Sequence, residues 1–214
     1  FVDIAGLVRG ASKGEGLGNQ FLAHIREVDA ICHVLRCFEN GDITHVEGKI
    51  DPVADAETVE TELMLSDLES LERRVEQTAK RAKQGNEEEK ARLAVMEKVL
   101  VALREGKPAR TVTPTEDEKK LYKELMLITA KPVLYVCNVE EAAAAEGNAF
   151  SARVKAKADA EGAAMVVISA AIEAEVAQLD SDEEKNAFLA DLGLTETGLT
   201  RVIRAGYGLL DLLT

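Results

Sequence analysis

The sequence predicts an α/β fold, in which a mostly parallel β-sheet is interrupted by an inserted helical hairpin. Short apolar runs at residues 30–38, 133–137 and 163–168 have the length and continuous hydrophobicity of strands buried on both faces. Residues 57–105 contain no Pro and a single Gly, and their apolar residues recur at helical spacing. The α/β pattern resumes after this stretch, so the helices interrupt one domain. We therefore expect three parts: residues 1–56, 57–129 and 130–214.

The bulk composition is typical of a globular protein. Of the 214 residues, 46% are hydrophobic and 30% are charged, far from the composition of disordered chains. The net charge of −13 disfavours nucleic-acid binding through the general surface, because phosphates repel an acidic protein. No apolar run approaches the about 18 residues that a membrane span needs, and no signal peptide is evident. We expect a cytoplasmic protein without a membrane partner.

The first segment is expected to form a right-handed crossover unit. Residues 1–5 resemble the end of a strand, and a loop rich in glycine follows. Apolar residues at helical spacing predict a helix over residues 19–28, and residues 30–38 form the next strand. Residues 39–55 are polar and typical of turns.

The helical stretch predicts two helices folded back on each other, because Gly85-Asn86 interrupts its apolar stripe near the middle. Each helix then buries one apolar face against the other. Thr115 and Glu118 have the spacing of a capping box and predict a third helix that ends near residue 129. Further helices are expected at residues 150–161, 182–192 and 198–213, the last broken around Gly206 and Gly208.

Positive side chains gather near the predicted tip of the hairpin. A solvated helix face is the simpler interpretation, and contact with ribosomal RNA phosphates is the alternative. Acidic residues 87–89 on the second helix weaken that alternative. The positive residues are Arg73, Arg74, Lys80, Arg81 and Lys83.

The cysteines and histidines predict no metal centre. Cys32, Cys37 and Cys137 all lie in apolar runs and are expected to be buried, reduced thiols. No CxxC pair occurs, and no histidine has ligand spacing with a cysteine, so we expect no zinc site. His33 is expected to pack in the core.

The chain opens on an Asp-x-x-Gly motif at a strand end, formed by Asp3 and Gly6. In nucleotide hydrolases such an Asp faces Mg²⁺, and such a Gly offers its N–H to the terminal phosphate. A glutamine that orients the attacking water often follows, but Leu7 stands here and cannot polarise water. Another group or a partner would then complete the site, and the loop from Arg9 to Asn19 would move as the switch.

Two further motifs follow strands 133–137 and 163–168, at the carboxyl ends where open α/β sheets bind ligands. Asn138-Val139-Glu140-Glu141 stands where GTPases have Asn-Lys-x-Asp, whose Asp accepts two hydrogen bonds from guanine. The longer Glu141 carboxylate cannot occupy the same place, which favours adenine read by backbone groups. Ser169-Ala170 is a small turn that lets N–H groups approach a base. Each motif alone also fits a polar cap after a strand, but their order predicts a nucleotide site.

These motifs resemble the YchF / Obg-like ATPase family, within the Obg-related branch of P-loop GTPases. The resemblance extends over essentially the whole chain. The segments that carry it are residues 1–19, 33–40, 138–141, 170–175 and 206–210.

The resemblance implies a hydrolase that prefers ATP over GTP, uses Mg²⁺, associates with ribosomes and acts in translation or stress, without sequence-specific nucleic-acid binding. It places Asp3 at Mg²⁺, through water, and Gly6 at the γ-phosphate. Glu141 takes the specificity position, and Gly147-Asn148 is a weaker candidate for continuing the base-side loop. The residues implied around adenine are Asn138, Val139, Ser169 and Ala170.

The P-loop and the TGS domain of that family have no counterpart in this sequence. The resemblance therefore implies part of a longer protein, a part that alone binds nucleotide weakly and is inactive. Two alternatives stay open. One is a true GTPase, and the other is a non-enzymatic module that acts through its helical hairpin.

Overall fold

The computed structural model describes residues 1–2, 17–40 and 50–212, and it divides into two compact units. The hairpin unit consists of Phe1–Asp29 and Glu57–Pro132, and the sheet unit of Ala30–Ala56 and Val133–Thr214. Residues 3–5 of the expected strand and the glycine loop up to residue 16 lie outside the described residues, and residues 1–2 are not in a strand. Gly18, expected in that loop, lies instead in the first turn of α1 (Leu17–Glu27).

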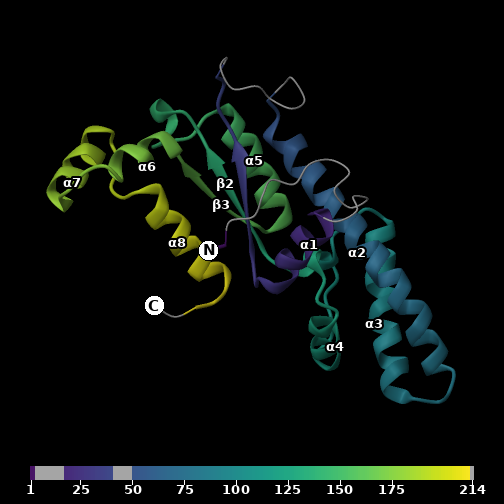
Figure 1. Ribbon diagram of the computed structural model, residues 1–214. Coiled ribbons are helices and arrows are strands. Elements are labelled where there is room, and N and C mark those ends of the chain that lie inside the picture. The colour runs from purple at the N-terminus through teal and green to yellow at the C-terminus, as the bar shows by residue number, and fades with distance from the viewer. Residues whose placement is uncertain (3–16, 41–49, 213–214) are drawn as a thin grey trace. The chain divides into compact units, whose positions relative to one another are not determined.

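The sheet unit is built on a parallel sheet with the strand order β1-β2-β3 in its described part (Figure 1). The strands are β1 (Ile31–Arg36), β2 (Val133–Asn138) and β3 (Ala164–Ile168). Asn138 is in register with Arg36 on one side and with Ile168 on the other. The predicted parallel α/β architecture is confirmed, and the carboxyl ends of the three strands lie at one edge of the sheet.

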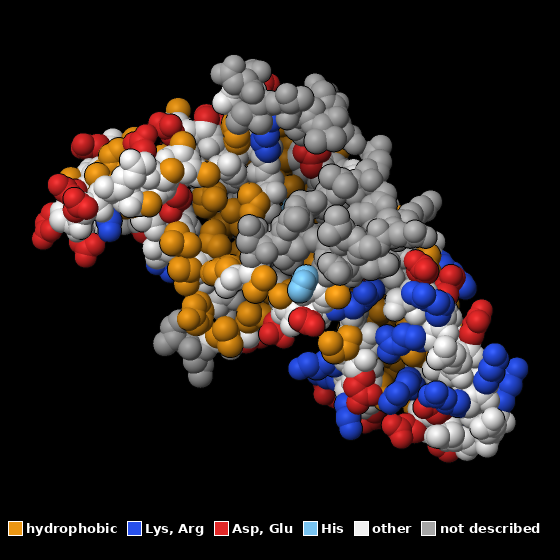
Figure 2. All heavy atoms as spheres, in the orientation of Figure 1, with side chains coloured by type: hydrophobic (Ala, Val, Ile, Leu, Met, Phe, Trp, Pro, Cys, Tyr) orange, Lys and Arg blue, Asp and Glu red, His pale blue; other side chains and the backbone are white. Residues whose placement is uncertain are grey.

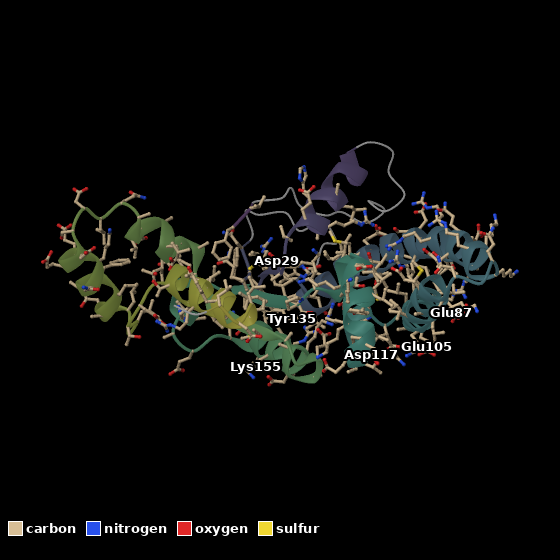
Figure 3. All side chains as sticks on the ribbon, turned by 90° about the horizontal axis from the view of Figure 1, so that it is seen from below. Asp29, Glu87, Glu105, Asp117, Tyr135 and Lys155 are labelled. Atoms are coloured by element: carbon tan, nitrogen blue, oxygen red, sulfur yellow. The ribbon has the colours of Figure 1, made fainter. Side chains whose placement is uncertain are left out.

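Helices cover both faces of this sheet (Figure 1). Leu35, Tyr135 and Cys137 form one core with Val154 and Ala158 of α5 (Ala149–Glu161), because alternate strand residues point to the same face. Figure 3 shows Tyr135 within this unit and Lys155 on the outer side of α5. The opposite face packs against α8 (Gly198–Leu209).

The last helices differ in part from the prediction. α8 continues through Gly206 and Gly208, so the expected break is wrong: neither glycine has a positive φ, and packing against β3 supports the helix. Leu199 and Tyr207 of α8 are exposed. Figure 2 shows apolar side chains gathered where Figure 1 draws α8. The sequence did not predict α6 (Ala170–Val176), whereas α7 (Asp182–Asp191) was expected.

The hairpin unit confirms the two antiparallel helices. They are α2 (Pro52–Ala82) and α3 (Glu87–Arg104), preceded in the chain by α1 (Leu17–Glu27). α2 begins earlier than expected, because proline suits the first helical position and Asp51 accepts a hydrogen bond from the Ala54 N–H. Gly85 turns the chain with a φ of +88°, and the Asn86 side chain caps α3.

The expected third helix is interrupted. It consists of the short helices η3 (Glu116–Glu118), α4 (Lys119–Glu124) and η4 (Ile128–Ala130). Met126, with a φ of +52°, breaks the helical path. The turn that follows is held by Asp67 of α2, whose buried carboxylate accepts hydrogen bonds from the Ile128 and Thr129 N–H groups and the Thr129 hydroxyl.

The positive residues of the hairpin agree only in part with the interpretation as a solvated helix face. Arg73 lies 3.8 Å from Glu69, and Arg81 lies 3.9 Å from Glu89. Arg74 instead points inward and donates to the Leu125 carbonyl at 2.7 Å. Figure 2 shows positive and negative side chains interspersed over this unit, so the visible face carries mixed charge.

We predict that Asp67→Asn destabilises the protein by about 1–3 kcal/mol, because its amide NH₂ would face groups that need a buried acceptor. Urea unfolding measures the loss. Asp117→Asn, at an exposed position of η3, is the control and should change the unfolding free energy by less than about 0.5 kcal/mol. Equal effects of the two substitutions would contradict this assignment.

We also predict that His33 makes stability fall in mild acid. Burial disfavours its imidazolium and lowers the pKa of His33 to about 4. Between this value and the pKa of about 6.5 in the unfolded chain, the unfolded state binds more protons, so stability is lost as the pH falls. From pH 7 to 5 this one group contributes a loss of about 2 kcal/mol.

The measurement is urea unfolding at both pH values for the wild type and His33→Gln. The variant should lose less stability than the wild type on acidification. Parallel losses in the two proteins would show that His33 is not responsible.

Candidate functional site

The two described motifs meet at the carboxyl edge of the sheet. The Asn138 Oδ1 atom accepts a hydrogen bond from the Ala170 N–H at 2.9 Å, and the Val139 N–H donates to the Ile168 carbonyl at 2.8 Å. The structure therefore brings the Asn138–Val139 and Ser169–Ala170 segments side by side. Parallel pairing is the cause, since it aligns Asn138 with the end of β3.

The side chains in this group contribute unequally. Val139 packs in the core of the sheet unit and its N–H is already bonded to Ile168, so the Val139 carbonyl is the group left to meet a ligand. Ser169 is buried, and its hydroxyl has no hydrogen-bond partner among the described residues. Ala170 and Glu141 are exposed. A ligand at this edge would thus meet small side chains, backbone groups and the exposed Glu141 side chain.

The helix that follows the Ser169–Ala170 turn, α6, is linked to the start of α8 by a residue that the sequence analysis did not single out. The two carboxylate oxygens of Glu173 in α6 accept hydrogen bonds from the Gly198 N–H at 2.6 Å and the Leu199 N–H at 3.0 Å. Gly198 leaves room for this contact, because a Cβ there would lie 2.8 Å from Ile168 and 2.9 Å from Glu173. No local signal reveals the pair, since its members are 25 residues apart.

Gly147 and Asn148 close the loop that follows β2. Gly147 has a φ of +82°, and Asn148 caps α5 through its Oδ1 atom. A glycine followed by an Asn-x-x-Ser capping pattern is a readable helix start. From the sequence we expected these two residues only as weaker candidates for continuing the base-side loop.

The phosphate-side candidates cannot be placed. Asp3, Gly6, Leu7 and Arg9 lie outside the described residues. Among the residues that the structure describes, no group of three or more His, Cys, Asp or Glu side chains could hold a metal ion. The assignment of Mg²⁺ to Asp3 therefore stays a prediction.

The cysteines agree with the expectation except at one position. Cys37 and Cys137 are buried and free, and their mutual hydrogen bond together with burial raises the pKa of the Cys37 thiol. Cys32 is exposed instead. It lies on the face of β1 that also carries the exposed Val34, so the expectation of burial is wrong there. His33 is half-buried and its ring lies 6.0 Å from that of Tyr135, so it packs at the margin of the core.

None of the described helices is both long enough and apolar enough to cross a membrane.

Comparisons with known proteins identify relatives over the whole chain. A family model described as "50S ribosome-binding GTPase" matches residues 1–65. The chain is 55% identical over 214 residues to a protein of Haemophilus ducreyi named "Ribosome-binding ATPase YchF", and 49% identical over 216 residues to the protein of that name from Bacillus subtilis. The alignments cover 100% of this chain and 58% and 59% of those relatives.

A solved structure also resembles this chain over most of its length. "Structure of the Schizosaccharomyces pombe YchF GTPase" superimposes with a TM-score of 0.81 and 33% sequence identity, over 96% of this chain and 56% of that one. The chain thus spans a little more than half the length of the relatives it matches.

We predict that Asn138→Ala destabilises the sheet unit by about 1 kcal/mol, because the Ala170 N–H loses its acceptor. Urea unfolding and the hydrogen-exchange rate of the Ala170 amide both report the loss. Asn186→Ala, at an exposed position in α7, is the control and should leave the Ala170 amide unchanged. An Ala170 amide that stays equally protected in Asn138→Ala would contradict the prediction.

Proposed function

Since this chain is homologous over its whole length to the YchF ribosome-binding ATPases, we propose that the protein carrying it is a nucleotide hydrolase that prefers ATP over GTP. The joined motifs at the carboxyl edge of the sheet are the observation that supports this most directly. The Asn138 side chain holds the Ser169–Ala170 turn, which forms a base-side surface made of backbone and small side chains.

The preference for adenine is argued from Glu141. A guanine-specific Asp accepts two hydrogen bonds from the guanine edge, and the extra methylene of Glu141 moves its carboxylate away from that position. Adenine presents a donor amino group and an acceptor ring nitrogen, which backbone carbonyl and N–H groups can pair with. The exposed Ala170 adds a flat apolar contact for the ring.

The phosphate side of the reaction is assigned by motif alone. Asp3 would hold Mg²⁺ through water, and the Gly6 N–H would meet the γ-phosphate. A bound Mg²⁺ would supply charge neutralisation at the phosphates. Leu7 cannot orient the attacking water, so another group or a partner has to do this. Positioned water and charge stabilisation suffice without a covalent intermediate.

Association with ribosomes is the second part of the proposal. The relatives' names describe ribosome-binding ATPases, and the matching family model describes a 50S ribosome-binding GTPase. We propose a cytoplasmic protein that acts in translation or stress. A true GTPase is the competing candidate, since that family model and the matching Schizosaccharomyces pombe structure both carry the word GTPase.

We predict that the protein, expressed at the full length of its relatives, binds ATP at least about tenfold more tightly than GTP, a difference of about 1.4 kcal/mol. Equilibrium titration with each nucleotide in the presence of Mg²⁺ measures both constants. Tighter binding of GTP would overturn the adenine assignment, and binding of neither would favour a non-enzymatic module.

A matched pair of substitutions tests whether Glu141 sets the preference for ATP over GTP. Glu141→Asp should bring the dissociation constants for ATP and GTP closer together. The shorter side chain moves the carboxylate back toward the position from which an Asp binds guanine. Glu146→Asp, the same change at an exposed position of the same loop, should leave the ratio as it is.

A further inference from the structure

The Asn148 side chain connects three segments around the base-side motifs. Its Nδ2 atom donates to the Cys37 carbonyl at 2.6 Å and to the Glu140 carboxylate at 2.9 Å. Its Oδ1 atom accepts from the Phe150 and Ser151 N–H groups, both at 3.0 Å. A side-chain amide has two N–H donors and two acceptor lone pairs, so all four are in use.

These contacts reach the loop that carries the specificity position. Glu140 stands between Val139 and Glu141, and Cys37 directly follows β1. The Asn148 amide therefore ties the loop to the end of the neighbouring strand, while the Asn138 side chain ties the start of the same loop to Ala170. Two asparagines thus hold the two ends of residues 138–148.

The approach to Asn148 is itself constrained. Gly147 has a φ of +82°, and a Cβ there would lie 2.5 Å from the Ser151 hydroxyl. That hydroxyl accepts the Asn148 N–H at 2.8 Å. Backbone and side chain of Asn148 are therefore fixed by the start of α5, which makes its amide a rigid support for the loop.

Helix capping alone does not account for the arrangement. Asn86 caps α3 in the same way, with its Oδ1 atom accepting from the Glu88 N–H at 3.0 Å and the Glu89 N–H at 3.2 Å. Within the described part of the chain, however, no residue accepts a hydrogen bond from the Asn86 Nδ2 atom. The bridge to another strand and to a loop is the feature that distinguishes Asn148.

We propose that Asn148 is a positioning residue for nucleotide selection: its Nδ2 bridge to Cys37 and Glu140 holds the Val139–Glu141 loop in the geometry that reads the base. This inference rests on the nucleotide-binding function proposed above. In the described part of the chain the Asn148 side chain hydrogen-bonds to Cys37, Glu140, Phe150 and Ser151 and to none of the groups assigned to the base. It therefore acts through Glu140 and the loop backbone.

The test compares Asn148→Asp with Asn86→Asp in the protein at the full length of its relatives. Aspartate keeps the capping oxygen at both positions but removes the Nδ2 donors, and at residue 148 it sets a carboxylate against the Glu140 carboxylate and the Cys37 carbonyl. Titrations with ATP and GTP, steady-state hydrolysis and urea unfolding are measured for each variant.

We expect Asn148→Asp to weaken ATP binding about three- to tenfold, because only part of the free energy of the two lost Nδ2 hydrogen bonds reaches the base site. The ratio of ATP affinity to GTP affinity should fall, while kcat changes less than the dissociation constant. Asn86→Asp should change the dissociation constant less than about twofold, as surface substitutions do. Glu140→Ala removes the loop half of the bridge at an exposed position. It should shift the ATP to GTP ratio in the same direction, and it carries the test if Asn148→Asp does not fold.

Hydrogen exchange separates this inference from the proposed function. Amides of residues 139–147 should exchange faster in Asn148→Asp than in Asn86→Asp, whether or not nucleotide is present. Loss of stability with an unchanged ATP to GTP ratio would overturn the positioning role and leave Asn148 as a helix cap. A wild-type protein that binds neither nucleotide would instead overturn the proposed function, and the nucleotide-selection role with it.

Discussion

The central strand β2 is the constraint on which the sheet unit depends. Both of its edges are paired, and residues Val133 to Cys137 are buried. Because its last residue is in register with the ends of β1 and β3, the loops that follow the strands must meet at one edge. The Asn138 carbonyl accepts from the Cys37 N–H while its side chain accepts from Ala170. Strand pairing and site geometry are thus parts of one hydrogen-bond system.

In the hairpin unit, too, a side-chain oxygen accepts hydrogen bonds from backbone N–H groups of a distant segment. Its chain leaves the helices through a turn whose N–H groups have no helical partner, and Asp67 supplies the missing acceptors from within the core. Burial raises the pKa of the Asp67 carboxyl, although its three hydrogen bonds and the positive charge of Arg26 oppose the rise. The buried Asp67 carboxylate stabilises the fold only while Ile128 and Thr129 donate hydrogen bonds to it. The position of α2 is therefore coupled to the segment that leads into β2.

The base-side edge of the sheet depends on backbone groups more than on side chains. Val139 packs in the core and Ser169 is enclosed, so recognition there would depend on how accurately the loops are held. That requirement gives weight to residues that do not touch a ligand, such as Glu173, which fixes the start of α8, and Asn148, which joins the loop to β1. A site of this kind is altered by substitutions behind it as readily as by substitutions within it.

Periodicity and spacing in the sequence determined the strands, the antiparallel hairpin and the order of the motifs, because these follow from local patterns of apolar residues, glycines and caps. The tertiary structure alone decided which polar groups became partners. Glu173 with Gly198 and Asn148 with Cys37 are distant in the chain, and nothing in either segment encodes the other. The interruption of a helix at Met126, and the continuation of α8 through Gly206 and Gly208, likewise became evident only in the tertiary structure. Packing and hydrogen bonding to distant segments outweigh the small local preferences on which sequence interpretation depends.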